Sequence, residues 1–255
     1  MFFLSPLEHF QVYPLISIYF LNYDYSITNE TIILLLFLIL ISIYFLSFVK
    51  NSENSFYIVP NNRWQVLNEL LFLGLLSVIS ENIKHELGQK FFPLIFFIFI
   101  FIFGLNVIGL VPFSFALTGH LIVTMFISLS VFLAINIMGY RIHGLKIFSL
   151  FLPSGTCSPL YFLIVLIEFI SYFFRPISLF IRLFANVMAG HVLIKVILGF
   201  VYVLMGAGGF LFILHYIPLL ILLPLFILEL FVVVIQSLVF CLLVCIYIND
   251  CLNLH

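Results

Sequence analysis

The chain has 255 residues, of which 65% are hydrophobic and 7% are charged, and its formal net charge at pH 7 is -1. Soluble domains carry about 25% charged residues, so this composition excludes a water-soluble globular protein and predicts one membrane domain over residues 1–255, with lipid as its solvent. The near-neutral charge also excludes nucleic acid as a partner, because nucleic-acid-binding proteins present basic patches to phosphate.

The cysteines and the N-terminal stretch carry no recognisable metal or targeting pattern. Four cysteines lack both CxxC and Cys/His spacing, so we expect them to pack as small hydrophobic residues, with no metal and no cofactor. They are Cys157, Cys241, Cys245 and Cys251. The stretch MFFLSPLEHFQVYPL contains no Lys or Arg, which is unlike a signal or transit peptide, so no removable address is expected.

Apolar runs in the first part of the chain predict membrane-spanning helices. A run of about 18 residues or more can cross a bilayer as a helix while satisfying its own backbone hydrogen bonds. Residues 31–49, 91–115 and 121–140 meet this length and predict three ordinary spans. Residues 63–88 place polar side chains opposite a Leu-rich face, which predicts an amphipathic helix at the membrane interface.

Two longer apolar stretches, 158–204 and 210–248, are separated by a glycine-rich turn and predict a helical hairpin. A helix over 158–204 would measure about 70 Å, more than twice the hydrocarbon thickness, so we expect it to be strongly tilted or broken. Bends are expected at Pro176, Pro218 and Pro224. The predicted fold is therefore an all-α polytopic membrane protein with three ordinary spans, one interfacial amphipathic helix and a C-terminal hairpin of two long, strongly tilted helices.

The distribution of basic residues predicts the orientation. Lys and Arg gather in two loops, one between the first two spans and one after the span over 121–140, whereas the N-terminal stretch has none. Loops rich in Lys and Arg stay on the inner side of a membrane. The N-terminus is therefore expected outside and the C-terminus inside.

The predicted hairpin contains ionisable residues at membrane depth, where a charge costs several kcal/mol and usually faces a partner or a water-filled cavity. Helical projection gathers the polar residues of its first helix on one stripe: Glu168, Arg175, Ser178, Arg182 and Asn186. The second helix has a matching stripe: His215, Glu229, Gln236 and Tyr247. His191 and Lys195 project to the far side of the first helix.

Structural roles compete with functional ones at several of these positions. Arg175 can pair with Glu168, which lies two helical turns away. Lys195 can extend its ammonium group to the interface. His215 borders the glycine-rich turn, where an interfacial position competes with a role in proton transfer.

Arg182 and Glu229 are the strongest candidates for function. No acid lies three or four residues from Arg182 to neutralise it, and a guanidinium stays protonated. Glu229 has no local cation either, so its carboxyl can exist in the neutral form that proton exchange requires.

Residues 175–191, RPISLFIRLFANVMAGH, resemble a signature of subunit a of F-type ATP synthases, together with Glu168 upstream and the Glu229 and Gln236 pair downstream. The resemblance extends from about residue 91, through GLNVIGLVPF, to the C-terminal IYINDCLNLH, and SPLEHF near the start is similar to mitochondrial members of the plant and protist type.

This resemblance implies a stator of the mitochondrial inner membrane, which conducts protons between two offset half-channels and a rotating ring of two-helix c subunits. Other expected partners are peripheral stalk subunits of the ATP synthase complex and membrane lipid. The sequence contains nothing like GxxxxGK[ST], so ATP chemistry is assigned to partner chains and this chain is not an enzyme by itself.

The resemblance also implies roles for individual residues. Arg182 matches the essential arginine that faces the ring carboxyl and blocks a direct proton leak. His191 and Glu229 match the pair that lines the outer half-channel, and Glu168 matches a polar site of the inner one. The remaining candidates for proton translocation are Ser178, Asn186, Gln236 and His215. Bacterial members commonly have Glu at position 191 and His at 229, which suggests that the two groups act as a unit.

Two other functions of apolar membrane chains with buried charges fit this pattern less well. A hydrophobic subunit of a respiratory-chain proton pump would show charges at the midpoints of several repeated spans, whereas here they cluster in one hairpin. A secondary transporter would show paired half-helices and an internal repeat, and neither is evident. A purely structural anchor has no use for an unpaired arginine at depth.

Overall fold

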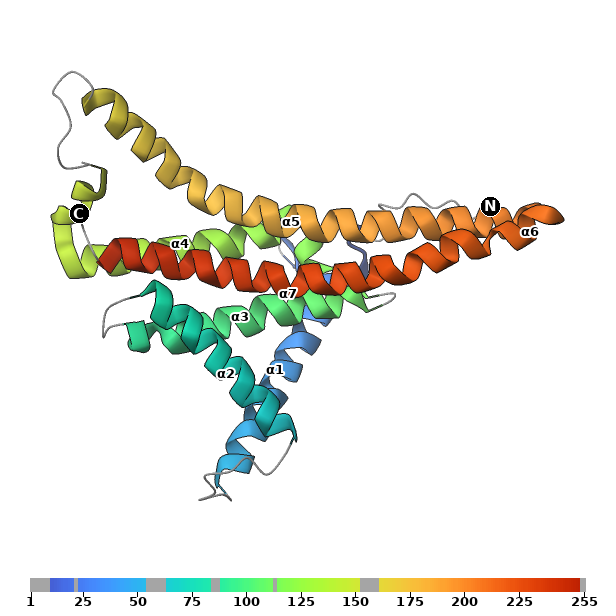
Figure 1. Cartoon of the computed structure of the whole chain (residues 1–255), viewed down its shortest axis with the longest axis horizontal. Helices are drawn as coiled ribbons and strands as arrows, with labels where there is room; N and C mark the ends of the chain where they lie inside the picture. The colour runs from blue at the N-terminus through green and yellow to red at the C-terminus, as the bar shows by residue number, and fades with distance from the viewer. Residues whose placement is uncertain are drawn as a thin grey trace. The chain divides into compact units, whose positions relative to one another are not determined.

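The computed structural model describes residues 10–20, 23–53, 63–83, 88–111, 114–151 and 161–252. Within these ranges, helices dominate the fold (Figure 1). Six of them are long and apolar enough to cross a membrane, so the chain is a multi-pass membrane protein. Our expectations for Cys157 and for residues 84–87 and 158–160 lie outside the described residues.

The chain forms two compact units. The first combines Met1–Gln65, Ile102–His120 and Phe184–Gln236, and the second combines Val66–Phe101, Leu121–Leu183 and Ser237–His255. Helices α3 (Gly88–Leu110), α5 (Tyr161–Ala207) and α7 (Tyr216–Leu252) therefore each contribute to both units.

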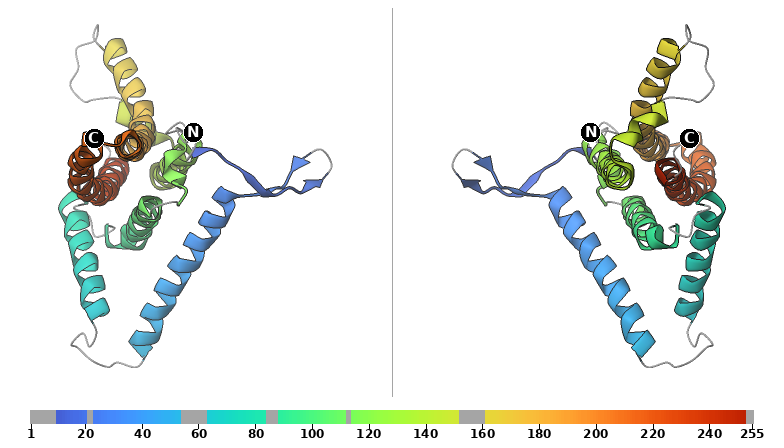
Figure 2. Two further views of the ribbon diagram at one scale, coloured as in Figure 1. Left: turned by 90° about the vertical axis from the view of Figure 1, so that its right-hand side faces the viewer. Right: turned by 90° about the vertical axis from the view of Figure 1, so that its left-hand side faces the viewer.

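The first unit begins with a feature that the apolar pattern did not predict, a narrow antiparallel hairpin beside the start of α1 (Figure 2). Its strands are β1 (Pro14–Ile16), β2 (Tyr19–Phe20), β3 (Tyr23–Asp24) and β4 (Ile27–Thr28). β1 pairs with β4, and β2 pairs with β3. The strands are too short and too exposed to leave a period-two signal in the sequence.

Side-chain caps fix the start of α1 (Asn29–Glu53). The backbone N–H of Thr28 donates to Oγ1 of Thr31 at 3.0 Å, and the N–H of Thr31 donates back to Oγ1 of Thr28 at 3.4 Å. Asn29 joins this helix start to the residues just before β1, because its Oδ1 accepts from the N–H of Tyr13 and its Nδ2 donates to the carbonyl of Gln11, both at 3.2 Å. The caps satisfy backbone groups that a helix terminus leaves open.

The second half of α5 and the first half of α7 run side by side in the first unit (Figure 1). α5 continues for 47 residues through Pro176, a length of about 70 Å at 1.5 Å per residue, so it is not broken into shorter pieces. The turn after it contains Gly208 and Gly209 at φ of 68° and 59°, which favours glycine. A short helix, α6 (Phe210–Leu214), then ends at His215, where α7 begins a new helix.

The second unit contains α2 (Arg63–Asn82), α4 (Leu121–His143) and η3 (Gly144–Phe151), with the first half of α5 and the end of α7. Phe72 of α2 packs on Phe92 of α3 with ring centroids 4.3 Å apart. By length and composition α2 also qualifies as a span. Cys241, Cys245 and Cys251 are buried and reduced, as small apolar side chains.

Candidate functional site

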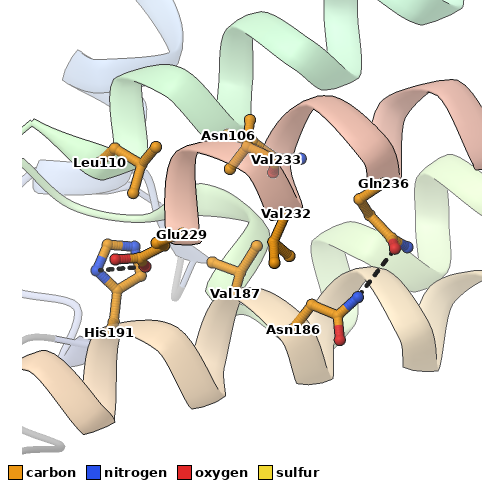
Figure 3. Close-up of a pocket in the computed structure, with 9 residues that line it drawn as sticks. All are labelled: Asn106, Leu110, Asn186, Val187, His191, Glu229, Val232, Val233 and Gln236. Carbon is orange, nitrogen blue, oxygen red and sulfur yellow. Dashed lines mark hydrogen bonds and ion pairs between the residues drawn. The ribbon is translucent and has the colours of Figure 1, made fainter. Parts of the chain in front are cut away.

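A histidine and a glutamate meet between the two hairpin helices. Nδ1 of His191 on α5 lies 4.0 Å from Oε1 of Glu229 on α7, and their side chains are only 12% and 8% exposed. Figure 3 shows the two groups pointing toward each other. Because burial removes most of the water around both groups, a charge on one of them depends on the other for stabilisation.

The backbone of α5 leaves room for this carboxyl at one position. A Cβ placed on Gly190 would lie 2.6 Å from Oε1 of Glu229, closer than real contacts allow. Gly190 therefore lets the Glu229 side chain lie directly against α5, within reach of the imidazole one residue further on.

The pair lines a small cavity, about 10 Å³ when measured as the space open to the centre of a water molecule, which is about the size needed for one water. Its lining residues come from α3, α5 and α7 (Figure 3): Asn106, Leu110, Asn186, Val187, His191, Glu229, Val232, Val233 and Gln236.

Asn106 of α3 is a site residue that the sequence analysis did not single out. Its side chain is 2% exposed, and neither polar atom of its amide finds a hydrogen-bond partner within the described ranges. Oε2 of Glu229 likewise has no hydrogen-bond partner within these ranges. Buried polar atoms without protein partners usually contact water. The only sequence signal was an amide inside the apolar run 91–115.

A direct hydrogen bond joins the same two helices further along. Nδ2 of Asn186 on α5 donates to Oε1 of Gln236 on α7 at 2.9 Å (Figure 3). Two residues from the predicted polar stripes are thus joined in space, and the bond fixes the register of the two helices in the first unit.

Arg182 lies in the second unit, one helical turn before Asn186 along α5. It is half-buried, and its Nη2 contacts Oγ of the exposed Ser178 at 3.5 Å. Within the described ranges no carboxylate forms an ion pair with Arg182. That Arg182 has no acid of its own stays a prediction of the sequence.

Arg175 does have an acid, but not the one we expected. Its Nη1 donates to Oδ2 of Asp250 on α7 at 2.8 Å, and its guanidinium lies over the rings of Tyr172 and Tyr247, 5.3 and 5.1 Å from their centroids. The expected pairing with Glu168 is wrong, because Asp250 approaches from another helix, and helical projection considers one helix at a time.

The other candidates lie away from the cavity. His215, at the junction of α6 and α7, is buried, and its Nδ1 contacts the carbonyl oxygen of Phe212. Nζ of Lys195 lies 6.0 Å from the ring centroid of Phe10, and its extension to the interface stays a prediction. Glu168 is half-buried and forms no ion pair within the described ranges.

This arrangement favours proton exchange over binding of a larger molecule. The cavity has room for about one water molecule, and it contains a carboxyl and an imidazole, the side chains that exchange protons most readily near neutral pH. No group of three His, Cys, Asp or Glu side chains suited to a metal occurs in the described ranges. The fold and site define a multi-pass membrane protein with ionisable pairs between its long helices.

Comparison with known proteins identifies the family. The sequence model of the family described as ATP synthase A chain matches residues 31–249. The chain is 42% identical to ATP synthase subunit a of Marchantia polymorpha and 45% identical to that of Pylaiella littoralis, in each case over 98% of this chain and 99% of the relative. It is also 39% identical to ATP synthase subunit a of Acanthamoeba castellanii, over 98% of both chains. The chain therefore belongs to the ATP synthase A chain family.

Proposed function

We propose that this chain is the proton-translocating stator subunit of an F-type ATP synthase in the mitochondrial inner membrane. It conducts protons to and from a rotating c-ring through two offset half-channels, and so couples proton flow to ATP synthesis. The chain itself performs no ATP chemistry, which belongs to partner subunits. The N-terminus is assigned to the intermembrane space and the C-terminus to the matrix, following the positive-inside rule.

The observation that carries this proposal is Arg182, a half-buried cation without a carboxylate partner in the described part of the chain. A permanent charge at membrane depth needs a counter-charge. A ring of c subunits supplies one, because each c subunit brings a membrane carboxyl past the guanidinium. The cation then favours the ionised carboxyl, and a protonated carboxyl cannot pass directly from one half-channel to the other.

The face of α5 near Arg182 suits such a moving partner. Ser178, Ala185 and Ala189 are small and exposed, and small residues let helix backbones approach closely in membranes. A peripheral stalk and membrane lipid would cover other apolar surfaces of the chain.

His191 and Glu229 then serve the outer half-channel and Glu168 the inner one. One elementary charge moving down 100 mV releases only about 2.3 kcal/mol, so no step can leave an unpaired charge in hydrocarbon. A carboxyl that is either protonated and neutral, or ionised beside a protonated imidazole, avoids such a state.

The test is to replace Arg182 in the assembled complex. We expect Arg182→Ala and Arg182→Lys to abolish ATP-driven proton pumping by the complex in vesicles, while the complex still assembles. Lys retains the charge but not the planar, delocalised guanidinium, and Arg141→Lys, in the last turn of α4 and outside the hairpin, serves as the matched control. Normal pumping by the Arg182→Ala complex would refute the proposal.

Crosslinks from exposed positions of α5 test the c-ring as the partner of this helix. We expect them to reach a small two-helix subunit present in many copies.

A further inference from the structure

A second ionisable pair lies in the first unit, outside the cavity already described. Nε2 of His120 lies 3.4 Å from Oε1 of Glu30. Glu30 is in the first turn of α1 and His120 directly precedes α4, so both sit at the ends of candidate spans. Their side chains are 26% and 25% exposed, against 12% and 8% for His191 and Glu229. Nε2 of His120, which faces Glu30, is itself buried, so the exposure of this histidine lies on its other ring atoms.

One aromatic ring contacts the histidines of both pairs. The ring of Phe10 meets His120 edge-on with centroids 6.5 Å apart, and it meets His191 edge-on with centroids 6.1 Å apart. Phe10 is 8% exposed and packs with Ala116 and Val187. Phe10 therefore connects the accessible pair to the buried one.

The surroundings hold these rings in place. A Cβ on Gly119 would lie 2.5 Å from the Phe10 ring, so a larger residue there would displace the ring. Phe115 stacks on His120 with centroids 4.9 Å apart, and the caps of Thr28 and Asn29 fix the turn of α1 that carries Glu30.

The charged groups around Phe10 form one cluster. Glu30 and His120 are the accessible members, His191 and Glu229 the buried members, and the Nζ of Lys195 lies 6.0 Å from the Phe10 ring centroid. All of these residues belong to the first unit. The cluster thus places acidic and basic side chains between the ends of two candidate spans, at Glu30 and His120, and the buried carboxyl of Glu229.

We propose that Glu30 and His120 are a proton-loading pair that supplies His191 and Glu229, with Phe10 as a positioning residue between the two histidines. This inference rests on the proposed function. A hydronium ion at the surface beside this pair gives its proton to the His120 imidazole and becomes water, while the Glu30 carboxylate stabilises the imidazolium. The imidazolium passes one proton inward to His191 and returns to its neutral form.

Phe10 gives this route its selectivity. An apolar ring between the histidines excludes a continuous column of water and of hydrated ions, and it fixes the edge of the His191 ring by packing. Protons can be relayed from one imidazole to the other by ring motion and single waters, whereas a metal cation would have to lose its hydration shell.

The experiment measures proton flux through the assembled complex in vesicles under an imposed pH difference. We expect His120→Gln to lower the flux by about 10²-fold when proton supply is limiting, at the low end of what a positioned proton-transfer group contributes. Glu30→Gln should lower it in the same direction. The double variant should be no slower than His120→Gln, because residues that act as a unit are not additive.

Chemical rescue separates proton transfer from a purely structural role. Imidazole added to the medium should restore much of the flux in His120→Gln, and it should leave the unmodified complex unchanged. His143→Gln and Glu69→Gln are matched controls for the loss of a histidine and of a carboxyl, and both should keep unmodified flux. Unmodified flux in His120→Gln, or a loss that imidazole does not restore, would overturn the proposal.

Phe10 is tested with two substitutions. Phe10→Leu keeps an apolar group of similar size and should retain most of the proton flux, while Phe10→Ala should admit water and hydrated cations, so that added Na⁺ lowers its proton flux. The same response to Na⁺ in the two variants would overturn the role given to Phe10. If Arg182→Ala abolishes pumping while all loading-pair variants behave normally, the proposed function stands and this inference alone fails.

Discussion

Gly190 and Glu229 are in such close contact that any side chain at position 190 displaces the Glu229 carboxyl. A Cβ there would lie 2.6 Å from Oε1, 3.0 Å from Cδ and 3.3 Å from Cγ of Glu229. The carboxyl must therefore move if the glycine gains even one methyl group, and its distance to the imidazole of His191 must change with it.

We predict that Gly190→Ala lowers proton flux without preventing assembly of the complex. The matched control is Gly199→Ala on the same helix, where a Cβ would meet nothing within 4 Å. That control should keep normal flux and gain stability of up to about 1 kcal/mol from helix propensity. Combining Gly190→Ala with Glu229→Asp, which shortens the acid, should recover part of the flux. Equal flux in the Gly190→Ala and Gly199→Ala complexes would contradict the prediction.

Glu229 is also predicted to exchange protons directly. Glu229→Gln should slow proton uptake by about 10²-fold, because the amide keeps the shape of the side chain but cannot release a proton. Adding His191→Glu should restore part of the rate, since it returns a carboxyl to the same cavity. The measurement is ATP-driven acidification of vesicles. If there is neither loss nor rescue, the pair has a structural role only.

The Arg175 and Asp250 ion pair is predicted to stabilise the second unit. Asp250→Asn leaves the guanidinium without its acid, so the thermal unfolding midpoint of the complex should fall. Arg175→Gln combined with Asp250→Asn should recover part of the loss, because no uncompensated charge remains. Glu168→Gln should leave the midpoint unchanged. If Glu168→Gln lowered the unfolding midpoint more than Asp250→Asn does, Glu168 and not Asp250 would be the acid that pairs with Arg175.

Asn106 is predicted to contribute to conduction at the expense of stability. Asn106→Leu removes a buried amide that has no protein partner within the described ranges, a situation that costs about 1–3 kcal/mol. The Asn106→Leu variant should be at least as stable as the unmodified chain but conduct fewer protons. Asn106→Ser, which keeps a hydroxyl in the cavity, should conduct more protons than Asn106→Leu. Lower stability together with normal flux would contradict this assignment.

The sequence predicted the class of fold because membrane spans are specified by run length and composition, and six helices confirm a multi-pass protein. It also singled out Arg182, since the absence of nearby acids on the same helix can be read directly from the chain. The family resemblance is confirmed by the match over residues 31–249 and by relatives of 39 to 45% identity.

Contacts between helices could not be predicted in this way. A helical projection gives the direction of a side chain but not the element that it meets, so Arg175 was assigned to Glu168 instead of Asp250. Phe10 had no distinguishing signal, because in the sequence it is one of 34 phenylalanines. Its role follows from packing against Gly119 and His191, which are more than 100 residues away in the chain.

The caps at the start of α1 have a consequence for the N-terminal strand. Asn29 holds Gln11, the residue after Phe10, and Tyr13, while the adjacent Glu30 pairs with His120. The Asn29 side chain thus fixes both the segment that carries Phe10 and the helical turn that carries Glu30. Replacing Asn29 would therefore displace Phe10 and Glu30 together. We expect Asn29 to be needed for proton delivery, although it transfers no proton itself.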